Sequence, residues 1–209
     1  MDIVDKIIVN YNVGTPVLSL FMMKSLCEKN DIKFMKGPNT LDGKSSIKSV
    51  IKWIVNEDNP KINEKLFISH LKGTINIEAT TVVISLSINN SHSNIIMINK
   101  KTNTFEYFEP NYPFRHSLLI QYFYDLCNSV YTLKKVDQPI INLDSLQDKY
   151  GKYINRGWCD LICFIRILNL DPSRALPILL TIDAKHLEYV TFNTICTDLA
   201  SNIITFVSE

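Results

Sequence analysis

Three residues of different chemistry are arranged along the chain so that they could act together. His92 opens a segment rich in β-branched residues, Glu109 closes an aromatic segment, and Cys159 stands just before an apolar run. An imidazole can take a proton from a thiol near neutral pH, and a carboxylate can orient that imidazole. A cysteine, a histidine and an acid brought together supply a nucleophile, a general base and an orienting group. The residue types therefore define one candidate site for nucleophilic catalysis by a thiol.

A predicted hairpin brings the histidine and the acid together. The segments SNIIMIN and TFEYFE have the composition of β-strands, and KKTN lies between them as the turn. A turn centred between Lys100 and Lys101 makes His92 and Glu109 direct cross-strand neighbours, with Cβ atoms about 4.5 to 5.5 Å apart. A register slip of one residue would place the two side chains on opposite faces. The pairing therefore depends on the geometry of the turn.

The third residue stands at the start of a predicted buried helix. In RGWCDLICFIRILNL, residues 161–170 are almost wholly apolar, which predicts a helix inside the domain that begins near Trp158 or Cys159. Unsatisfied amide groups and the helix dipole favour negative charge at such a position. Cys163 is a rival nucleophile, but it lies a full turn further along the helix, where we expect it to be inert. The position of Cys159 thus favours a thiolate.

Each of the three residues also has an ordinary structural interpretation. A histidine at the start of a strand is often solvated, and a glutamate before proline at a strand end is often on the surface. A cysteine that leads an apolar helix is often a small buried apolar residue. Spacing alone leaves these interpretations open.

The remaining sequence predicts an α+β fold, with a small central mixed sheet flanked by helices. Helical periodicity is present in TPVLSLFMMKSLC, in residues 47–56, in FRHSLLIQYFYDLCNSVY and near the C-terminus. Leu118, Leu119 and Phe123 belong to the apolar face predicted for the third of these. Strand patterns occupy Ala79 to Ile88, Ser93 to Asn99, Thr104 to Glu109 and TLKKVDQPII, whereas residues 36–46 and 143–157 are predicted loops.

Composition limits the class of protein. The net charge is +1, from 22 basic and 21 acidic residues, which gives no electrostatic reason to expect nucleic acid or an anionic membrane as a partner. The five cysteines are scattered, without a CxxC pair, so neither a disulfide framework nor a zinc site is indicated. We find no signal peptide pattern and no apolar run long enough to cross a bilayer. These features predict an intracellular, cytoplasmic protein, and the Ile-, Asn- and Lys-rich composition would suit an AT-rich genome such as that of a large DNA virus.

The order of these segments resembles a known group of enzymes. HSNIIMINKKTNTFEYFEP, followed by a helical segment and then GWCDLICFI, resembles the catalytic core of the adenovirus endopeptidase and ubiquitin-like (SUMO) protease clan. The likeness is greatest to the compact cysteine proteases of large DNA viruses, and it covers roughly Ala79 to Leu170. The clan has the order His, acid, Gln, Cys, and this chain has His92, Glu109, Gln147 and Cys159 in that order.

The resemblance implies a role for each of these residues. Cys159 would be the nucleophile, His92 the general base and Glu109 the group that stabilises the imidazolium. Gln147 would supply a side-chain N–H to an oxyanion hole shared with the backbone of Cys159; its alternative interpretation is a solvated loop amide. Asn94 matches a His-x-Asn pattern of the viral relatives, where it would share a strand face with His92, or it would be a cross-strand partner of Tyr107.

The resemblance also implies an activity. We expect a single domain over residues 1–209, with residues 1–75 as a helical extension and residues 79–170 as the catalytic core of a monomeric thiol protease that needs no cofactor and no metal. Its protein substrates would be viral structural precursors or ubiquitin-like conjugates, in the host cytoplasm, the viral factory or the virion. Two alternatives stay open: an acetyltransferase of the same clan, which would take acetyl groups from coenzyme A, and a catalytically inactive binding module.

Overall fold

The computed structural model describes residues 31–39, 52–90, 92–110, 117–138 and 158–167, and the statements that follow refer to these residues. Their strands form one six-stranded mixed sheet. The strands are β1 (Ile32–Phe34), β2 (Lys52–Val55), β3 (Thr81–Ile88), β4 (His92–Asn99), β5 (Thr104–Phe108) and β6 (Lys134–Val136). The helices are α4 (Glu64–Lys72), α5 (Ser117–Asn128) and α7 (Trp158–Ile167). The predicted α+β class, with a mixed sheet flanked by helices, is confirmed.

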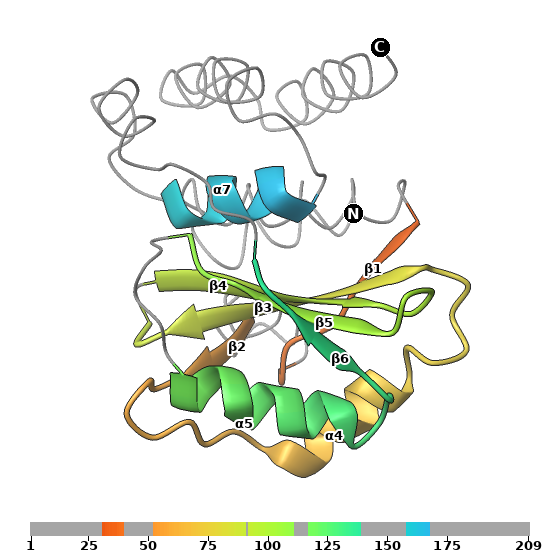
Figure 1. Ribbon diagram of the computed structural model, residues 1–209. Coiled ribbons are helices and arrows are strands. Elements are labelled where there is room, and N and C mark those ends of the chain that lie inside the picture. Colours follow the sequence, from red (N-terminus) through yellow and green to blue (C-terminus); the bar gives the residue numbers. More distant parts are fainter. Residues whose placement is uncertain (1–30, 40–51, 91, 111–116, 139–157, 168–209) are drawn as a thin grey trace, which may run out of the picture.

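The sheet has the order β1-β3-β4-β5-β6, with β2 also paired to β3. β3 is antiparallel to β4 and β4 is antiparallel to β5, whereas β1, β2 and β6 run parallel to their partners. α4 joins β2 to β3, and α5 joins β5 to β6. Figure 1 shows that both of these helices cover one face of the sheet and that α7 lies over the other face.

The main hydrophobic core lies between the sheet and the pair of helices α4 and α5. Alternate residues of β3 point into it, together with Trp53 and Phe105 from neighbouring strands and Phe67 and Phe123 from the helices. Trp53 contacts Phe67 edge to face, and Phe67 packs on Phe123, with ring centroids 5.0 and 5.6 Å apart. α4 begins where the Asn63 side chain accepts a hydrogen bond from the N–H of Leu66. This core fixes one face of the sheet, and the opposite face is left for α7.

The β4–β5 hairpin has a different register from the predicted one. Asn99 pairs with Thr104, so the loop contains four residues and its centre lies one residue later than predicted. The Asn99 side chain stabilises this loop by accepting hydrogen bonds from the N–H groups of Lys101 and Thr102, both at 3.0 Å. Asn103, with φ of 53°, adopts the left-handed conformation that asparagine tolerates. The strands are therefore offset by two residues, and an even offset leaves every side chain on its predicted face.

Other predictions differ from the structure in residues 31–75. The helix predicted over residues 47–56 is wrong in its described part, because Lys52–Val55 is strand β2, parallel to β3. Short apolar runs fit a buried strand and a helix equally well, and here tertiary pairing decides. β1 and β2 join the same sheet as the core, although the region up to residue 75 is expected to be a helical extension. The single-domain organisation stays a prediction.

Helix α5 follows its predicted apolar face with one exception. Leu119 and Phe123 are fully buried, but Leu118 is 73% exposed. The helix predicted for TPVLSLFMMKSLC and the one near the C-terminus lie outside the described residues, as does the loop at residues 143–157. None of the helices in the described residues is long and apolar enough to cross a membrane.

Two contacts in the second half of α7 hold the helix against the sheet. In its last turn, the Arg166 guanidinium binds the Glu106 carboxylate of β5 through two hydrogen bonds, at 2.8 and 2.5 Å. One turn before it, the Cys163 thiol donates a hydrogen bond of 3.4 Å to the Ser93 carbonyl of β4. Both partners of the ion pair are largely screened from water, with 19% and 10% of the side chain exposed. The pair therefore defines where the helix sits along the sheet.

Loss of either member of this ion pair should destabilise the protein, because the remaining charge is left without its partner. Arg166→Met and Glu106→Gln should each lower the free energy of unfolding, and the double variant should lose less than the two single losses added together. We expect a coupling free energy of about 1 to 3 kcal/mol in urea denaturation of the four proteins. Strict additivity would show that the pair does not anchor the helix.

Candidate active site

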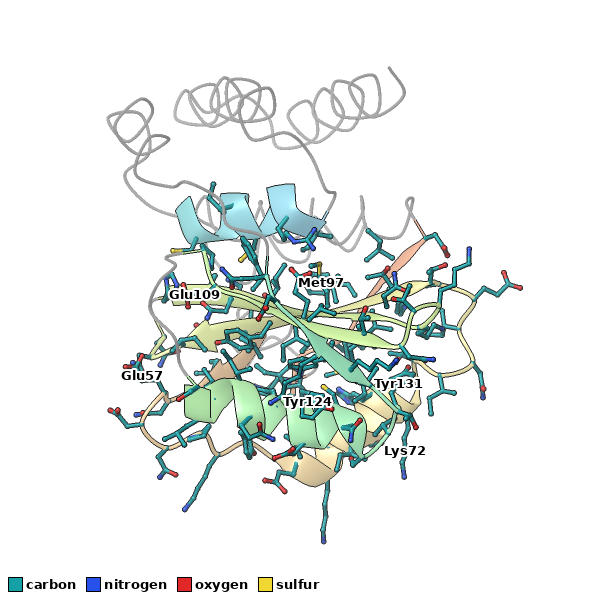
Figure 2. All side chains as sticks on the ribbon, in the orientation of Figure 1. Glu57, Lys72, Met97, Glu109, Tyr124 and Tyr131 are labelled. Atoms are coloured by element: carbon teal, nitrogen blue, oxygen red, sulfur yellow. The ribbon has the colours of Figure 1, made fainter. Side chains whose placement is uncertain are left out.

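His92 and Glu109 are in contact at one end of the sheet. His92 is the first residue of β4, Glu109 follows β5 directly, and the His92 Nε2 atom is hydrogen-bonded to Glu109 Oε1. The observed register places Glu109 opposite Asn94, so the contact with His92 is diagonal and depends on the length of the glutamate side chain. Figure 2 shows Glu109 at this end of the sheet, where β4 begins. The predicted contact is present, although the direct pairing predicted for it is wrong.

The carboxylate of Glu109 is buried and held by several groups. Only 4% of the residue is exposed, and its second oxygen accepts a hydrogen bond of 2.5 Å from Asn94 Nδ2. The same Asn94 nitrogen lies 2.7 Å from the hydroxyl of Tyr107. Asn94 therefore shares a strand face with His92, as expected. The expected cross-strand pairing of Asn94 with Tyr107 is wrong, because Tyr107 pairs with Ile96 and the contact of Asn94 with the Tyr107 hydroxyl is diagonal. Since a carboxylate only accepts hydrogen bonds, the contact with Glu109 fixes the orientation of the Asn94 amide.

Cys159 contacts the ring nitrogen of His92 that does not bind Glu109. Helix α7 begins at Trp158, so Cys159 is its second residue, and its Sγ atom lies 2.9 Å from His92 Nδ1. The first four N–H groups of a helix have no partner within the helix, and the dipole is positive at that end. The thiol is half-buried. Sulfur, imidazole and carboxylate therefore form a continuous chain of contacts, with one ring nitrogen directed at each partner.

The environment of His92 favours its charged form. Burial of the ring lowers its pKa, but hydrogen bonds to Cys159 and Glu109 and the charges of both partners outweigh burial and raise the pKa of His92 to about 10. The ring therefore keeps its proton at neutral pH and can donate it to a group that reacts beside it.

The other described cysteines lie in environments of a different kind. Cys127 is enclosed in the core below the sheet, where burial raises its pKa strongly. Cys163 is fully buried, and its thiol donates to the Ser93 carbonyl. A buried thiol cannot reach a substrate, so among the described cysteines only Cys159 combines access to solvent with a basic partner.

Gln147, the predicted oxyanion-hole residue, lies outside the described residues, and so do the side chains of Trp158 and Asp160. Among the described residues, no three His, Cys, Asp or Glu side chains come together as a metal site would require. One polar contact of the site was not foreseen from the sequence: the Gln138 side chain is hydrogen-bonded to the backbone of Glu109. Nothing in the sequence pattern around Gln138 signals this contact, since it depends on how β6 lies beside β5.

Comparison with known proteins adds little to this geometry. No family model and no curated protein matches the sequence. Among solved structures, the chain is similar to the SUMO protease Ulp1 with its catalytic cysteine oxidized to a sulfinic acid, at 17% identity over 76% of this chain and 77% of that one, with a TM-score of 0.32. The same protease with that cysteine oxidized to a sulfonic acid gives 16% identity, 78% and 77% coverage and a TM-score of 0.32. A TM-score this low does not establish a common fold, so the interpretation rests on the site itself.

The contact between Cys159 and His92 predicts selective alkylation. Iodoacetamide at about pH 6 should modify Cys159 much faster than Cys127 and Cys163, because those two thiols are buried whereas Cys159 is half-buried and lies beside the His92 ring. Peptide mapping by mass spectrometry measures the modified position. His92→Ala should slow the modification of Cys159, whereas His70→Ala, at a half-buried histidine on α4, should not. Equal rates for Cys159 in wild type and His92→Ala would contradict a role for the contact.

The raised pKa of His92 also predicts how stability depends on pH. The folded protein keeps a proton that the unfolded chain releases near pH 6.5, so this group's contribution to stability is complete below about pH 6.5 and is lost as the pH rises towards about 10. The difference in unfolding free energy between wild type and His92→Asn should therefore decrease from pH 6 to pH 10. Urea denaturation at a series of pH values measures it. A constant difference would mean that the pKa of His92 is not raised in the folded protein.

Proposed function

We propose that this protein is a thiol protease or isopeptidase that hydrolyses peptide bonds through an acyl-enzyme on Cys159. The observation that carries the proposal is the chain of contacts from Cys159 Sγ through both nitrogens of His92 to the buried carboxylate of Glu109. The order of these residues along the chain, and the resemblance of their surrounding segments to the adenovirus endopeptidase and ubiquitin-like protease clan, support the same activity. Glu109 acts as the orienting group in this proposal.

In the first half of the reaction, the Cys159 thiolate attacks the carbonyl carbon of the scissile peptide. A new S–C bond forms, and the carbonyl oxygen takes up the negative charge. The His92 imidazolium then gives its Nδ1 proton to the departing nitrogen, so that the C–N bond breaks and a neutral amine leaves. Glu109 holds the ring through its Nε2 atom throughout this step. The product is a thioester between the substrate acyl group and Cys159.

In the second half, His92 is neutral and acts as the base. Its Nδ1 atom takes a proton from a water molecule, whose oxygen attacks the thioester carbon. The C–S bond breaks, the carboxylic acid leaves, and the proton stays on the ring to restore the ion pair. No other group is needed to balance the protons.

The start of α7 is suited to stabilise the oxyanion of both steps. Cys159 is the second residue of the helix, so its own N–H is among those left without a partner within the helix. A backbone donor next to the nucleophile, aided by the helix dipole, is the usual arrangement for this purpose. Gln147 is the side chain that the sequence resemblance adds as a second donor.

The substrate classes implied by the resemblance are viral structural precursors and ubiquitin-like conjugates. They can be separated with an electrophilic probe that carries the C-terminus of ubiquitin or of a related modifier. Covalent capture of the probe by Cys159 would favour removal of modifiers, and processing of a precursor without capture would favour the viral role. Acetylation of a protein with consumption of acetyl-coenzyme A would instead identify an acetyltransferase. The absence of Cys159-selective alkylation in the intact protein would identify a catalytically inactive binding module.

Variants of the three residues should differ in a defined order. Cys159→Ala should abolish hydrolysis with little change in thermal stability, because a half-buried thiol is replaced by a small side chain. Cys163→Ala, the matched control on the same helix, should keep the rate of the chemical step. His92→Ala should lose more turnover than Glu109→Gln, since Glu109 acts only through the ring. The measurement is kcat with a peptide substrate, and equal losses for Cys159→Ala and Cys163→Ala would refute the assignment of the nucleophile.

A further inference from the structure

The backbone of Glu109 is bound by the side chain of a residue just beyond a neighbouring strand. Gln138 follows β6, and its Oε1 atom accepts a hydrogen bond of 2.7 Å from the N–H of Glu109. Its Nε2 atom donates in return to the carbonyl oxygen of Glu109, at 3.2 Å. One side-chain amide thus satisfies both backbone polar groups of the residue that contacts His92.

The contact between Gln138 and Glu109 lies just beyond the last paired residues of β5 and β6. The parallel pairing of β5 with β6 extends from Thr104 and Lys134 to Glu106 and Val136, and β5 itself ends at Phe108. Glu109 is buried, and buried backbone groups require hydrogen-bond partners. The amide of Gln138 has the same donor and acceptor as a peptide group, so it can bind both backbone groups of Glu109 beyond the last paired residues of β5 and β6.

The neighbour on the other side of Glu109 restricts it as well. Pro110 has no N–H of its own, and a proline limits the preceding residue to extended conformations. With Gln138 bound to the backbone and Asn94 bound to the carboxylate, Glu109 is fixed at both ends of its side chain. The diagonal contact with His92 requires a fixed Glu109 side chain, because a flexible side chain would also adopt rotamers that do not reach the ring.

We propose that Gln138 is a positioning residue, which holds the backbone of Glu109 so that its carboxylate meets Nε2 of His92. The inference rests on the proposed function for its catalytic consequence, but the contact itself can be tested without any substrate. Gln138 does not touch the reacting atoms. It acts through Glu109, and therefore through the protonation of the His92 ring.

The test replaces Gln138 with methionine, which has a similar length and no hydrogen-bonding amide. The pKa of His92 should fall towards its ordinary value, as it should in Glu109→Gln, and kcat should fall roughly ten- to a hundredfold, as expected for a displacement of about 1 Å in a catalytic array, with KM nearly unchanged. The ring is followed by NMR titration, with its signal assigned from the spectrum of His92→Asn. Gln121→Met is the matched control, since Gln121 is an exposed glutamine of α5 whose side chain binds Asp125 and Lys135 and does not touch Glu109. The His92 titration and kcat of this variant should equal those of wild type.

A folded Gln138→Met protein whose His92 titrates as in wild type would overturn the inference. If this variant does not fold, Gln138→Asn keeps the amide but shortens its reach by one methylene, and the same lowering of the His92 pKa is expected. An active wild type with an unaffected variant would reject the role of Gln138 and leave the protease proposal standing. An inactive wild type in which the substitution still lowers the pKa of His92 would reject the protease proposal and support the role of Gln138.

Discussion

The site depends on one buried negative charge, the carboxylate of Glu109. A carboxylate that is only 4% exposed costs several kcal/mol unless it is paired and hydrogen-bonded. Here one oxygen faces the ring of His92 and the other accepts from Asn94. Although burial lowers the pKa of His92, its hydrogen bonds to Cys159 and to this carboxylate raise the pKa to about 10. The charge of the ring beside the sulfur thus depends in part on the far end of the chain of contacts.

The hairpin explains why so much of this site could be predicted from the sequence. The alternation of side chains along a strand assigns His92, Asn94 and Glu109 to one face, and any even offset between the strands preserves that assignment. The observed register differs by two residues because the Asn99 side chain closes a four-residue loop, which no pattern in KKTN reveals. The contact between His92 and Glu109 also forms in the observed register, because a glutamate side chain is long enough to reach a diagonal neighbour on the next strand.

Other features of the structure depend on contacts between distant segments. Residues 52–55 have the periodicity of a helix, yet they form a strand because β3 offers an edge with which they can pair. Gln138 looks like an ordinary polar residue after a short strand, and its contact with Glu109 exists only because β6 runs parallel to β5. Sequence patterns report which face a residue occupies, whereas such pairings are decided by the three-dimensional arrangement.

The central claim is that His92 lies between Cys159 and Glu109 and bonds to both, and NMR titration of the His92 ring tests it directly. The ring is compared in wild type, Cys159→Ala and Glu109→Gln. The account predicts that the wild-type ring stays protonated up to about pH 10 and that each substitution lowers its pKa, because each removes one of the partners that raise it. A wild-type ring that titrates near pH 6.5, as in an ordinary histidine, would contradict the account.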